Sequence, residues 1–220
     1  EVKRNNADLG IVVDPDVDRL ALVSEDRSMF GEEYTLVAIS DYVLKNTSEE
    51  KLNRLGYKKN TVSNLSSTRA LRDITEKNGG SYQASAVGEV NVVKMMKDTQ
   101  SVIGGEGNGG IIFPELHYGR DAMVGVALFL SHLAKFGKIC SMLRESYPDY
   151  TIAKKKIELT PEIDIDKLLG QVKEKYKKQP INEVDGLKIE FDTEWVHLRR
   201  SNTEPIIRIY AESKSETTAN

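Results

Sequence analysis

The sequence predicts a mixed α/β protein, with a mainly parallel, helix-covered sheet followed by a small α+β domain that has an antiparallel sheet with helices. Up to about residue 148, short apolar runs of strand length alternate with longer segments of helix length, an order typical of parallel sheets. Beyond that point, one amphipathic segment precedes three closely spaced strand-like runs, as in antiparallel sheets. We therefore predict a domain boundary near residue 148.

Composition is that of a globular chain. The 220 residues are 39% hydrophobic and 30% charged, which fits one large or two small domains. A net charge of −3 provides no basic surface for nucleic acid, and no apolar run is long enough to span a bilayer. The polar residues 1–6 do not resemble a signal peptide, and the single Cys140 excludes an internal disulfide. We expect a cytoplasmic protein with no nucleic-acid or membrane partner, in which Cys140 is a buried apolar residue of a helix.

Helices of the first region are predicted from apolar spacing and end signals. Residues 32–45 begin with two acids and end with Lys45, the charge order that the helix dipole favours. Ser66 or Ser67 is expected to cap a helix at 68–77, which an Asn-Gly-Gly run ends. The other expected elements are a buried strand at 9–13, further strands at 20–23, 61–65, 82–87, 102–103 and 111–113, and helices at 90–97 and 121–134.

The second region starts with a strand at 151–159, whose Lys154–Lys156 run is interpreted as exposed. Residues 163–177 have the spacing of an amphipathic helix. Three antiparallel strands are expected at 186–191, 194–198 and 206–211. The tail after residue 213 stops where a new helix would begin, and we expect both ends to be cut from a longer chain.

Three carboxylates, Asp14, Asp16 and Asp18, stand in the turn between the first two predicted strands. Acids crowded in this way repel one another unless a cation lies between them, and all-oxygen sites suit hard divalent cations. Arg19 adds one positive charge at the rim, where an anionic group such as a phosphate could meet it. The alternative for this pattern is a solvated acidic turn.

A calcium loop of the EF-hand type is excluded for this turn. Counting from Asp14, the sixth position is Arg19, where such a loop requires glycine. The flanking segments are also predicted to be strands rather than helices.

A second candidate segment is the glycine-rich run at residues 104–110, predicted to be a turn. Its glycines allow close approach to the backbone. Glu106 and Asn108 carry its only side chains, and a carboxylate and a carboxamide suit sugar hydroxyls. The alternative is a long turn with solvated polar residues.

A third candidate segment is RRSNTEP at residues 199–205, between two predicted strands. Guanidinium groups, hydroxyls, an amide and turn-oriented backbone N–H groups suit an anion, and phosphate is the expected ligand. Arg208 lies on the strand that leaves the segment. The alternative is a polar hairpin tip in which Arg200 and Glu204 are solvated.

Together, these motifs resemble those of the α-D-phosphohexomutases, the phosphoglucomutase/phosphomannomutase family. DPDVDR at 14–19 is similar to the family's magnesium loop, commonly DGDGDR. GEGNGG at 105–110 is similar to its sugar loop, often GEMSGH, and residues 199–205 resemble its phosphate loop, RxSNTxP. All three occur in the family's order and rough spacing, so the resemblance covers almost the whole chain.

The resemblance implies a domain assignment. Residues 1–30 would be the end of the family's second domain with the metal loop, 31–148 the third domain, which recognises the sugar, and 149–220 a C-terminally truncated fourth domain, which binds phosphate. The N-terminal domains of the same parent chain, with a phosphoserine in a TASHNP-like segment, would be missing partners. The nearest segment here is SSTR at 66–69, interpreted as a helix cap.

The implied reaction interconverts hexose 1-phosphate and hexose 6-phosphate through a phosphoserine and a bisphosphate intermediate. By resemblance, Asp14, Asp16 and Asp18 hold Mg²⁺, and Arg19 is the catalytic residue that steadies the phosphoryl oxygens. The residues implied to bind sugar hydroxyls are Glu106 and Asn108, and those implied to bind the non-reacting phosphate are Arg199, Ser201, Asn202 and Thr203.

Departures from the family pattern leave two questions open. Gly110 stands where many members have a histidine that is a candidate proton shuttle, and His117 is the candidate substitute. Residues 86–89 match a segment where some members have a lysine or histidine near the phosphate. The general acid and base, and the choice among glucose, mannose and glucosamine, therefore stay open.

Two functions are compatible with these motifs. The first is the C-terminal part of a magnesium-dependent mutase, inactive by itself because it lacks the serine. The second is a non-catalytic sugar-phosphate binding module. The intact DxDxDR motif favours the mutase, since a binding module does not need a metal directed at a nucleophile.

Overall fold

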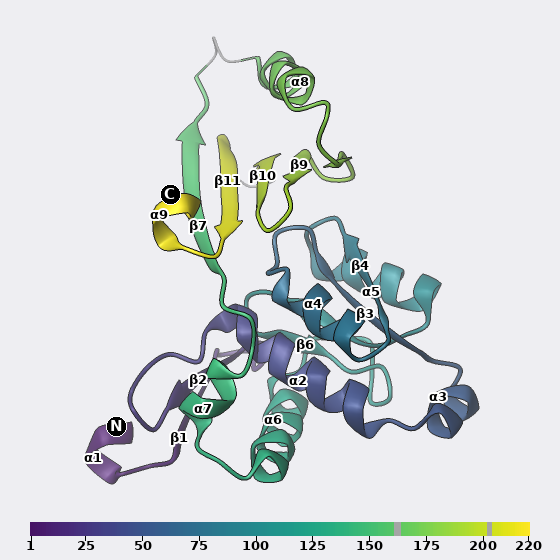
Figure 1. The fold of residues 1–220 in the computed structure, drawn as a ribbon, viewed down its shortest axis with the longest axis vertical. Coiled ribbons are helices and arrows are strands. Elements are labelled where there is room, and N and C mark those ends of the chain that lie inside the picture. The colour runs from purple at the N-terminus through teal and green to yellow at the C-terminus, as the bar shows by residue number, and fades with distance from the viewer. Residues whose placement is uncertain (161–163, 202–203) are drawn as a thin grey trace. The chain divides into compact units, whose positions relative to one another are not determined.

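The computed structural model describes residues 1–160, 164–201 and 204–220, and it divides into two compact units, Glu1–Pro148 and Asp149–Asn220 (Figure 1). The first unit contains a mainly parallel sheet with helices, and the second contains an antiparallel sheet. The predicted fold class is therefore confirmed. Among the described residues, no helix has both the length and the apolar character needed to cross a membrane.

A four-stranded sheet with the order β4-β3-β5-β6 forms the centre of the first unit. β3 (Lys58–Asn64) pairs in parallel with β4 (Ser81–Ser85) and with β5 (Ser101–Glu106). β6 (Gly110–Ile112) returns antiparallel to β5. Because parallel neighbours need a crossover, helices connect β3 to β4 and β4 to β5.

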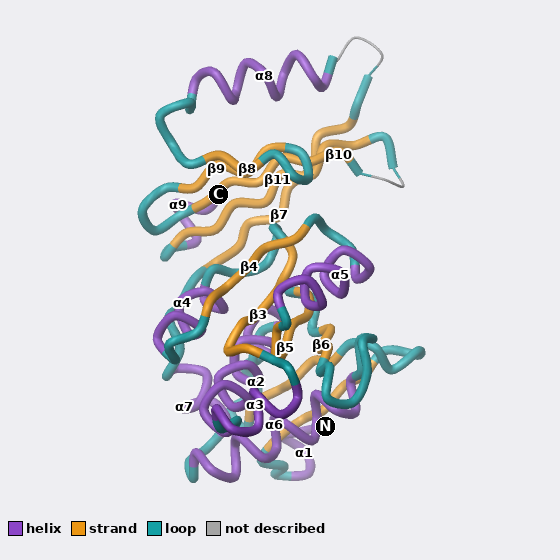
Figure 2. The backbone as a smooth tube through the Cα atoms, turned by 90° about the vertical axis from the view of Figure 1, so that its right-hand side faces the viewer, coloured by secondary structure: helices purple, strands orange, loops and turns teal. Residues whose placement is uncertain are grey.

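Helices cover both faces of this sheet. α2 (Glu32–Asn46) and α4 (Ala70–Lys77) pack on one face, and α5 (Glu89–Thr99) packs on the other (Figure 2). α6 (Ala122–Phe136) packs against α2 and β6. Under α5, the sheet and helix share a cluster of fully buried apolar side chains, which are Val62, Val92, Met96 and Ile112.

The remaining elements of the first unit are short. They are the helices α1 (Val2–Asn5), α3 (Glu49–Leu55) and α7 (Cys140–Glu145), and the strands β1 (Leu9–Val13) and β2 (Leu20–Ser24), which pair as an antiparallel hairpin. The strand predicted at 9–13 is present, but the prediction that it is buried is wrong, since Val12 is 55% exposed. Among the described residues, β2 is the only strand that pairs with β1, so the apolar run is an edge strand.

The glycine-rich run is mostly strand rather than the predicted turn. Residues 104–106 belong to β5 and residue 110 to β6, so that only residues 107–109 form the turn. A Cβ on Gly104 would lie 2.5 Å from the sulfur of Met96, and one on Gly105 would lie 2.1 Å from the carbonyl oxygen of Gly110. These glycines are required by close packing on both faces of the strand, whereas only Gly109 in this run has a positive φ, of 83°.

The predicted serine cap is also wrong. α4 begins at Ala70, and its N-cap residue Arg69 makes no side-chain capping bond. The hydroxyl of Ser67 instead accepts a hydrogen bond from the backbone N–H of Gly107 at 3.0 Å. Ser66 donates its backbone N–H to the side chain of Asn64. Ser67 therefore ties the end of β3 to the hairpin between β5 and β6, whereas Ser66 bonds within the turn that follows β3.

The second unit is a five-stranded antiparallel sheet with the order β7-β11-β10-β9-β8. Its strands are β7 (Thr151–Glu158), β8 (Ile181–Asn182), β9 (Leu187–Glu190), β10 (Trp195–Arg200) and β11 (Ile206–Ser213), and its helices are α8 (Ile165–Lys175) and α9 (Glu216–Ala219). The indole of Trp195 is buried and donates to Glu212 at 2.7 Å. Burial lowers the pKa of His197 to about 4.

The packing role of the glycine run can be tested with Gly105→Ala. The new methyl would overlap the β6 backbone, and overpacking of this kind costs about 1–3 kcal/mol of unfolding free energy. Hydrogen–deuterium exchange of the β5 amides should therefore become faster. Gly170→Ala is the control, because that α8 position has open space around it and should gain about 1 kcal/mol of helix propensity. Equal protection of β5 in wild type and Gly105→Ala would contradict the packing role.

Candidate functional site

The carboxyl ends of the three parallel strands meet at one edge of the first unit's sheet. β3, β4 and β5 end there at Asn64, Ser85 and Glu106. The side-chain amide of Asn64 donates to Glu106 Oε1 at 2.8 Å. Ligands of open α/β sheets bind at this edge, which makes it the candidate site.

The acidic turn between β1 and β2 brings its three carboxylates together. One oxygen from each of Asp14, Asp16 and Asp18 lies within 4.8 Å of the others. Asp14 Oδ1 accepts the backbone N–H groups of Asp18 and Arg19 at 3.1 and 3.0 Å, which closes the turn. Val17 has a φ of 57°, a left-handed conformation that is costly for a β-branched side chain.

The electrostatics of this turn fit a cation. Burial, together with a hydrogen bond to Asp14, raises the pKa of Asp18. For Asp14, desolvation is outweighed by backbone hydrogen bonds from Arg19 and Asp18, so its pKa is lowered. Asp18 Oδ1 is buried without a hydrogen-bond partner among the described residues, and Arg19 Nε lies 3.5 Å from it. An unsatisfied buried acceptor beside two more carboxylates suits a hard divalent ion such as Mg²⁺.

Two backbone hydrogen bonds connect the acidic turn and the start of β2 to the β5–β6 turn and to the start of α6. The N–H of Leu20 donates to the carbonyl of Gly109 at 3.0 Å, and the N–H of Ala122 donates to the carbonyl of Val17 at 3.0 Å. A Cβ on Gly109 would lie 2.3 Å from the carbonyl oxygen of Leu20. The two predicted loops of the first unit are therefore in direct contact.

Glu106 and Asn108 have different surroundings. Glu106 is 5% exposed, and its Oε2 accepts from Arg120 Nη1 at 2.9 Å. Asn108 Oδ1 accepts the backbone N–H of Gly110 at 3.1 Å, which closes the hairpin turn. The structure thus places Glu106 at the base of the site and Asn108 at the tip of the hairpin.

Arg120, like Asn64, belongs to this site although no sequence motif indicated it. Its guanidinium forms ion pairs with Asp18, with Glu106 at 2.9 Å and with Glu89 at 3.4 Å. Its backbone N–H also donates to Glu89 at 2.9 Å. In the sequence, Arg120 is one more charged residue before a predicted helix, and nothing nearby indicates three distant acidic partners.

His117, the candidate substitute for the family histidine, contacts the start of α6. Its Nε2 is 3.0 Å from an oxygen of Asp121, the N-cap residue of α6. The Asp121 side chain also accepts the N–H groups of Met123 and Val124. The position of Gly110 is instead filled from the side by the Arg120 stem, so the general acid and base stay unassigned.

The predicted phosphate segment lies in the second unit, where cations form a row across the sheet. Arg199 on β10 is opposite Arg208 on β11, which is opposite Lys156 on β7. Residues opposite one another in antiparallel strands share a face, and like charges in that arrangement repel. Arg199 Nε is buried without a hydrogen-bond partner among the described residues. A cavity of about 400 Å³ on the strands β7 and β11 is lined by Lys156, Arg208, Tyr210 and their neighbours.

The rest of this segment is partly described. The backbone N–H of Ser201, a buried residue, donates to the carbonyl of Ile206 at 2.9 Å. Glu204 pairs with Arg208 at 2.6 Å rather than being only solvated. Asn202 and Thr203 lie outside the described residues.

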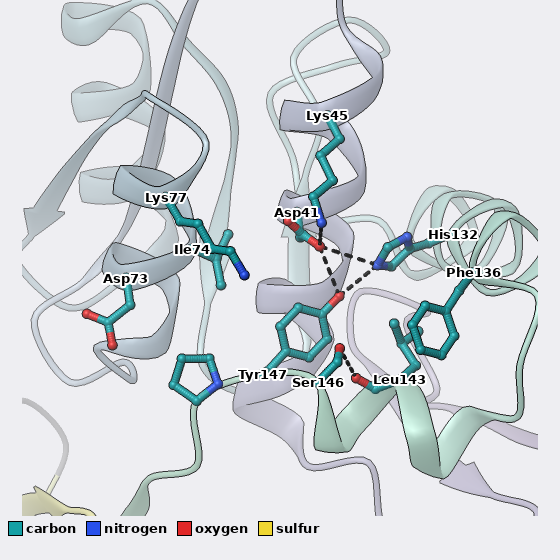
Figure 3. Close-up of a pocket in the computed structure, with 11 residues that line it drawn as sticks. Asp41, Lys45, Asp73, Ile74, Lys77, His132, Phe136, Leu143, Ser146 and Tyr147 are labelled. Atoms are coloured by element: carbon teal, nitrogen blue, oxygen red, sulfur yellow. Dashed lines mark hydrogen bonds and ion pairs between the residues drawn. The ribbon is translucent and has the colours of Figure 1, made fainter.

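A second cavity, of about 490 Å³, lies in the first unit and is not lined by any predicted site residue (Figure 3). On its wall, His132 Nε2 lies 2.6 Å from the hydroxyl of Tyr147, which donates to Asp41 at 3.3 Å. Lys45 pairs with the same aspartate at 2.7 Å. Burial lowers the pKa of His132 and raises that of Tyr147. These polar groups provide hydrogen-bond or ion-pair partners for one another. They connect α2 to α6 and to Tyr147, near the C-terminal end of the first unit.

Two family models match the chain. The phosphoglucomutase/phosphomannomutase alpha/beta/alpha domain III matches residues 31–150, more than half of the chain, and the C-terminal domain of the same family matches residues 157–220. The chain belongs to the phosphoglucomutase/phosphomannomutase family. The family predicted from the three motifs is thus confirmed.

Curated members of this family align along the full chain. A phosphoglucomutase/phosphomannomutase of Thermococcus kodakarensis is 34% identical over 99% of the chain and 46% of its own length. A phosphoglucosamine/phosphogalactosamine mutase of Sulfurisphaera tokodaii is 32% identical over 100% of the chain and 47% of its own length. The chain therefore spans about half the length of these relatives.

Solved structures of the family share the fold. A family protein from Burkholderia thailandensis superposes with a TM-score of 0.80 at 24% identity, covering 99% of this chain and 45% of that one. An N-acetylphosphoglucosamine mutase of Aspergillus fumigatus, solved with GlcNAc-6P and magnesium, has a TM-score of 0.66 at 15% identity, covering 95% of this chain and 49% of that one.

The cation site can be tested with Asp16→Asn. Loss of one of three anionic ligands should weaken Mn²⁺ binding, measured by electron paramagnetic resonance, by at least about tenfold, or 1.4 kcal/mol. Asp26→Asn is the control, because this exposed carboxylate after β2 bonds only to Ser28 in the described contacts. The site assignment fails if Asp16→Asn binds Mn²⁺ as tightly as Asp26→Asn does.

Proposed function

We propose that this chain carries the metal, sugar and phosphate sites of a phosphohexomutase, an isomerase that interconverts hexose 1-phosphate and hexose 6-phosphate through a phosphoserine and a bisphosphate intermediate. The contact between the acidic turn and the Glu106 hairpin carries this proposal. Leu20 bonds to Gly109 in that contact, and Arg120 pairs with both Asp18 and Glu106. A candidate cation site therefore adjoins a buried carboxylate suited to sugar hydroxyls.

The domain roles are part of this proposal. Residues 1–30 would form the end of the family's second domain, residues 31–148 the third domain and residues 149–220 the fourth. The model matches at 31–150 and 157–220 support the last two assignments. The N-terminal domains of the same parent chain would supply the phosphoserine.

The acidic turn would hold Mg²⁺ through Asp14, Asp16 and Asp18. A divalent ion held by these carboxylates would supply positive charge to neutralise the transferring phosphoryl group. Arg19 would bind phosphoryl oxygens, because its side chain is 52% exposed and lies 3.5 Å from both Asp14 and Asp18. These contacts hold the guanidinium at the rim and leave its exposed donors for an anion.

Glu106 would orient the sugar. Each carboxylate oxygen has two lone pairs, and the described partners, Asn64 and Arg120, use one on each oxygen. The remaining lone pairs can accept sugar hydroxyls from either orientation of the substrate. Asn108 would donate its side-chain NH₂ from the hairpin tip, since its oxygen is engaged by Gly110.

The non-reacting phosphate would bind in the second unit, to Arg199, Ser201, Asn202 and Thr203. The row of Arg199, Arg208 and Lys156 supports this role, since an anion would relieve the repulsion within it. A planar guanidinium fork such as that of Arg199 matches phosphate in a bidentate way.

The alternative is a non-catalytic sugar-phosphate binding module. The three clustered carboxylates, with Asp18 Oδ1 unsatisfied, favour the mutase, since binding a sugar phosphate alone does not require a divalent ion. Relatives include mutases named for mannose and glucosamine phosphates, so an assay must include several sugars.

The function is tested by ³¹P NMR of the parent protein that carries these residues, with Mg²⁺, glucose 1,6-bisphosphate and the 1-phosphates of glucose, mannose or glucosamine. We expect the 6-phosphate of at least one sugar to form. The 220-residue chain by itself should form none, because in the proposed division of roles the N-terminal domains supply the phosphoserine. Binding without turnover by the parent would favour the binding module, and turnover by the chain alone would overturn the proposed division of roles.

The phosphate segment is tested with Arg199→Ala in the parent. Charge-assisted hydrogen bonds contribute about 1.5–3 kcal/mol each, so the substrate KM should rise about 10- to 150-fold. Arg199→Lys should restore only part of the loss, because lysine lacks the planar fork. Arg200→Ala is the matched control, since this exposed neighbour points to the other face of β10. Wild-type kinetics for both Arg199 variants would indicate that the segment is only a polar hairpin tip and does not bind phosphate.

A further inference from the structure

We propose that Arg120 is the positioning residue of the sugar site, fixing the carboxylate of Glu106 against the acidic turn, and that residue 110 is glycine so that the Arg120 side chain can cross the hairpin. This inference rests on the proposed role of Glu106 in sugar binding. It assigns a function to two residues that do not themselves belong to the predicted ligand set.

The charges around Arg120 show why Glu106 depends on it. The Glu106 side chain is 7% exposed, and among the described residues Arg120 is the cation paired with it, while Asn64 is a neutral donor. The Arg120 side chain is itself only 16% exposed and contacts three carboxylates. A buried carboxylate that loses its cation is strongly destabilised where it stands and is expected to move toward water.

The guanidinium geometry fixes two positions at once. Nη1 contacts Glu106 and Nη2 contacts Asp18, so one rigid plane sets the separation of the sugar carboxylate from the acidic turn. Glu89 holds the other side, with Oε2 3.4 Å from Nε and Oε1 on the backbone N–H of Arg120.

The backbone of Arg120 has a fixed starting point beside β6. Arg120 forms an isolated bridge with Ile112, and the N–H of Asp121 donates to the carbonyl of Ile111 at 2.9 Å. From that point, the side chain must pass over residue 110 to reach Glu106 and Asp18.

Gly110 provides the space for that path. A Cβ at this position would lie 2.5 Å from Arg120 Cδ and 3.2 Å from Cγ, so the arginine stem would have to move. Gly110 is not among the glycines with positive φ, which means that the backbone there does not itself require glycine. The requirement is steric and comes from Arg120, together with a looser contact of 3.1 Å to Asn108.

The test measures affinity for the hexose 1-phosphate that the wild-type parent isomerises, by calorimetry with Mg²⁺ in the parent protein. Arg120→Ala and Gly110→Ala should each weaken binding by at least about tenfold, which corresponds to 1.4 kcal/mol. The double variant should bind no more weakly than Arg120→Ala, because no arginine stem is left for the new methyl to displace. Arg120→Lys should restore part of the affinity, since a point charge can pair with Glu106 without holding Asp18 in the same plane.

Two controls separate positioning from a general loss of structure. Arg144→Ala removes another partly buried arginine, which stacks on Tyr34 at 3.3 Å, and should lower Tm without changing the sugar-phosphate affinity. Mn²⁺ affinity of Arg120→Ala should not fall below that of wild type, because the acidic turn is closed by its own backbone bonds and loss of the cation beside Asp18 favours a metal ion there.

The outcomes are distinct. Wild-type affinity in Arg120→Ala, additive losses in the double variant, or an equal loss of Mn²⁺ binding would each overturn the role of Arg120. If Arg120→Ala does not fold, the sugar-phosphate affinities of Gly110→Ala and Arg120→Lys, compared with wild type, test the same role. A wild-type parent that neither binds nor isomerises any of the three sugars would instead refute the proposed function.

Discussion

The site depends on one close approach between two backbones, where the N–H of Leu20 meets the carbonyl of Gly109. This bond attaches the β1–β2 hairpin to the tip of the β5–β6 hairpin. It requires glycine at residue 109, both for the left-handed φ of 83° and because a Cβ there would lie 2.3 Å from the Leu20 carbonyl oxygen. Together with the bond from Ala122 to Val17 and the ion pairs of Arg120, it keeps the acidic turn beside Glu106.

Charge is distributed unequally between the two units. The sheet edge of the first unit gathers the three aspartates of the acidic turn with Glu89 and Glu106, and Arg19 and Arg120 are the cations paired with them in the described contacts. The sheet of the second unit presents Arg199, Arg208 and Lys156 in a row. An excess of acid suits a divalent cation and hydroxyl donors, whereas a row of cations suits phosphate. In the proposed function, the acidic edge would hold the metal ion and the sugar hydroxyls, and the row of cations would hold the phosphate.

Three sequence-based predictions were wrong for a shared reason, which is that local pattern does not report what lies opposite a residue. Ser66 and Ser67 resemble helix caps, but Ser67 bonds to Gly107 and Ser66 to Asn64. The run at 9–13 is apolar enough for a buried strand, yet only β2 pairs with it in the described structure. The glycines at 104 and 105 suggest a loop, whereas neighbouring helix and strand atoms leave no space for side chains there.

The sequence by itself determined most of the strands and helices in their order, the division near residue 148 and the family, and it suggested a ligand chemistry for each motif. These follow from contacts between near neighbours: apolar periods of two or about four residues, and carboxylates or donors packed into short turns. Only the tertiary structure decided that Asp18, Glu106 and Arg120 share one set of ion pairs. It also decided that the Arg120 side chain passes so close to Gly110 that a Cβ there would overlap it. Asp18 is far from Glu106 and Arg120 in the chain, and such ion pairs form only when the crossover topology brings strand ends together, which no local pattern encodes.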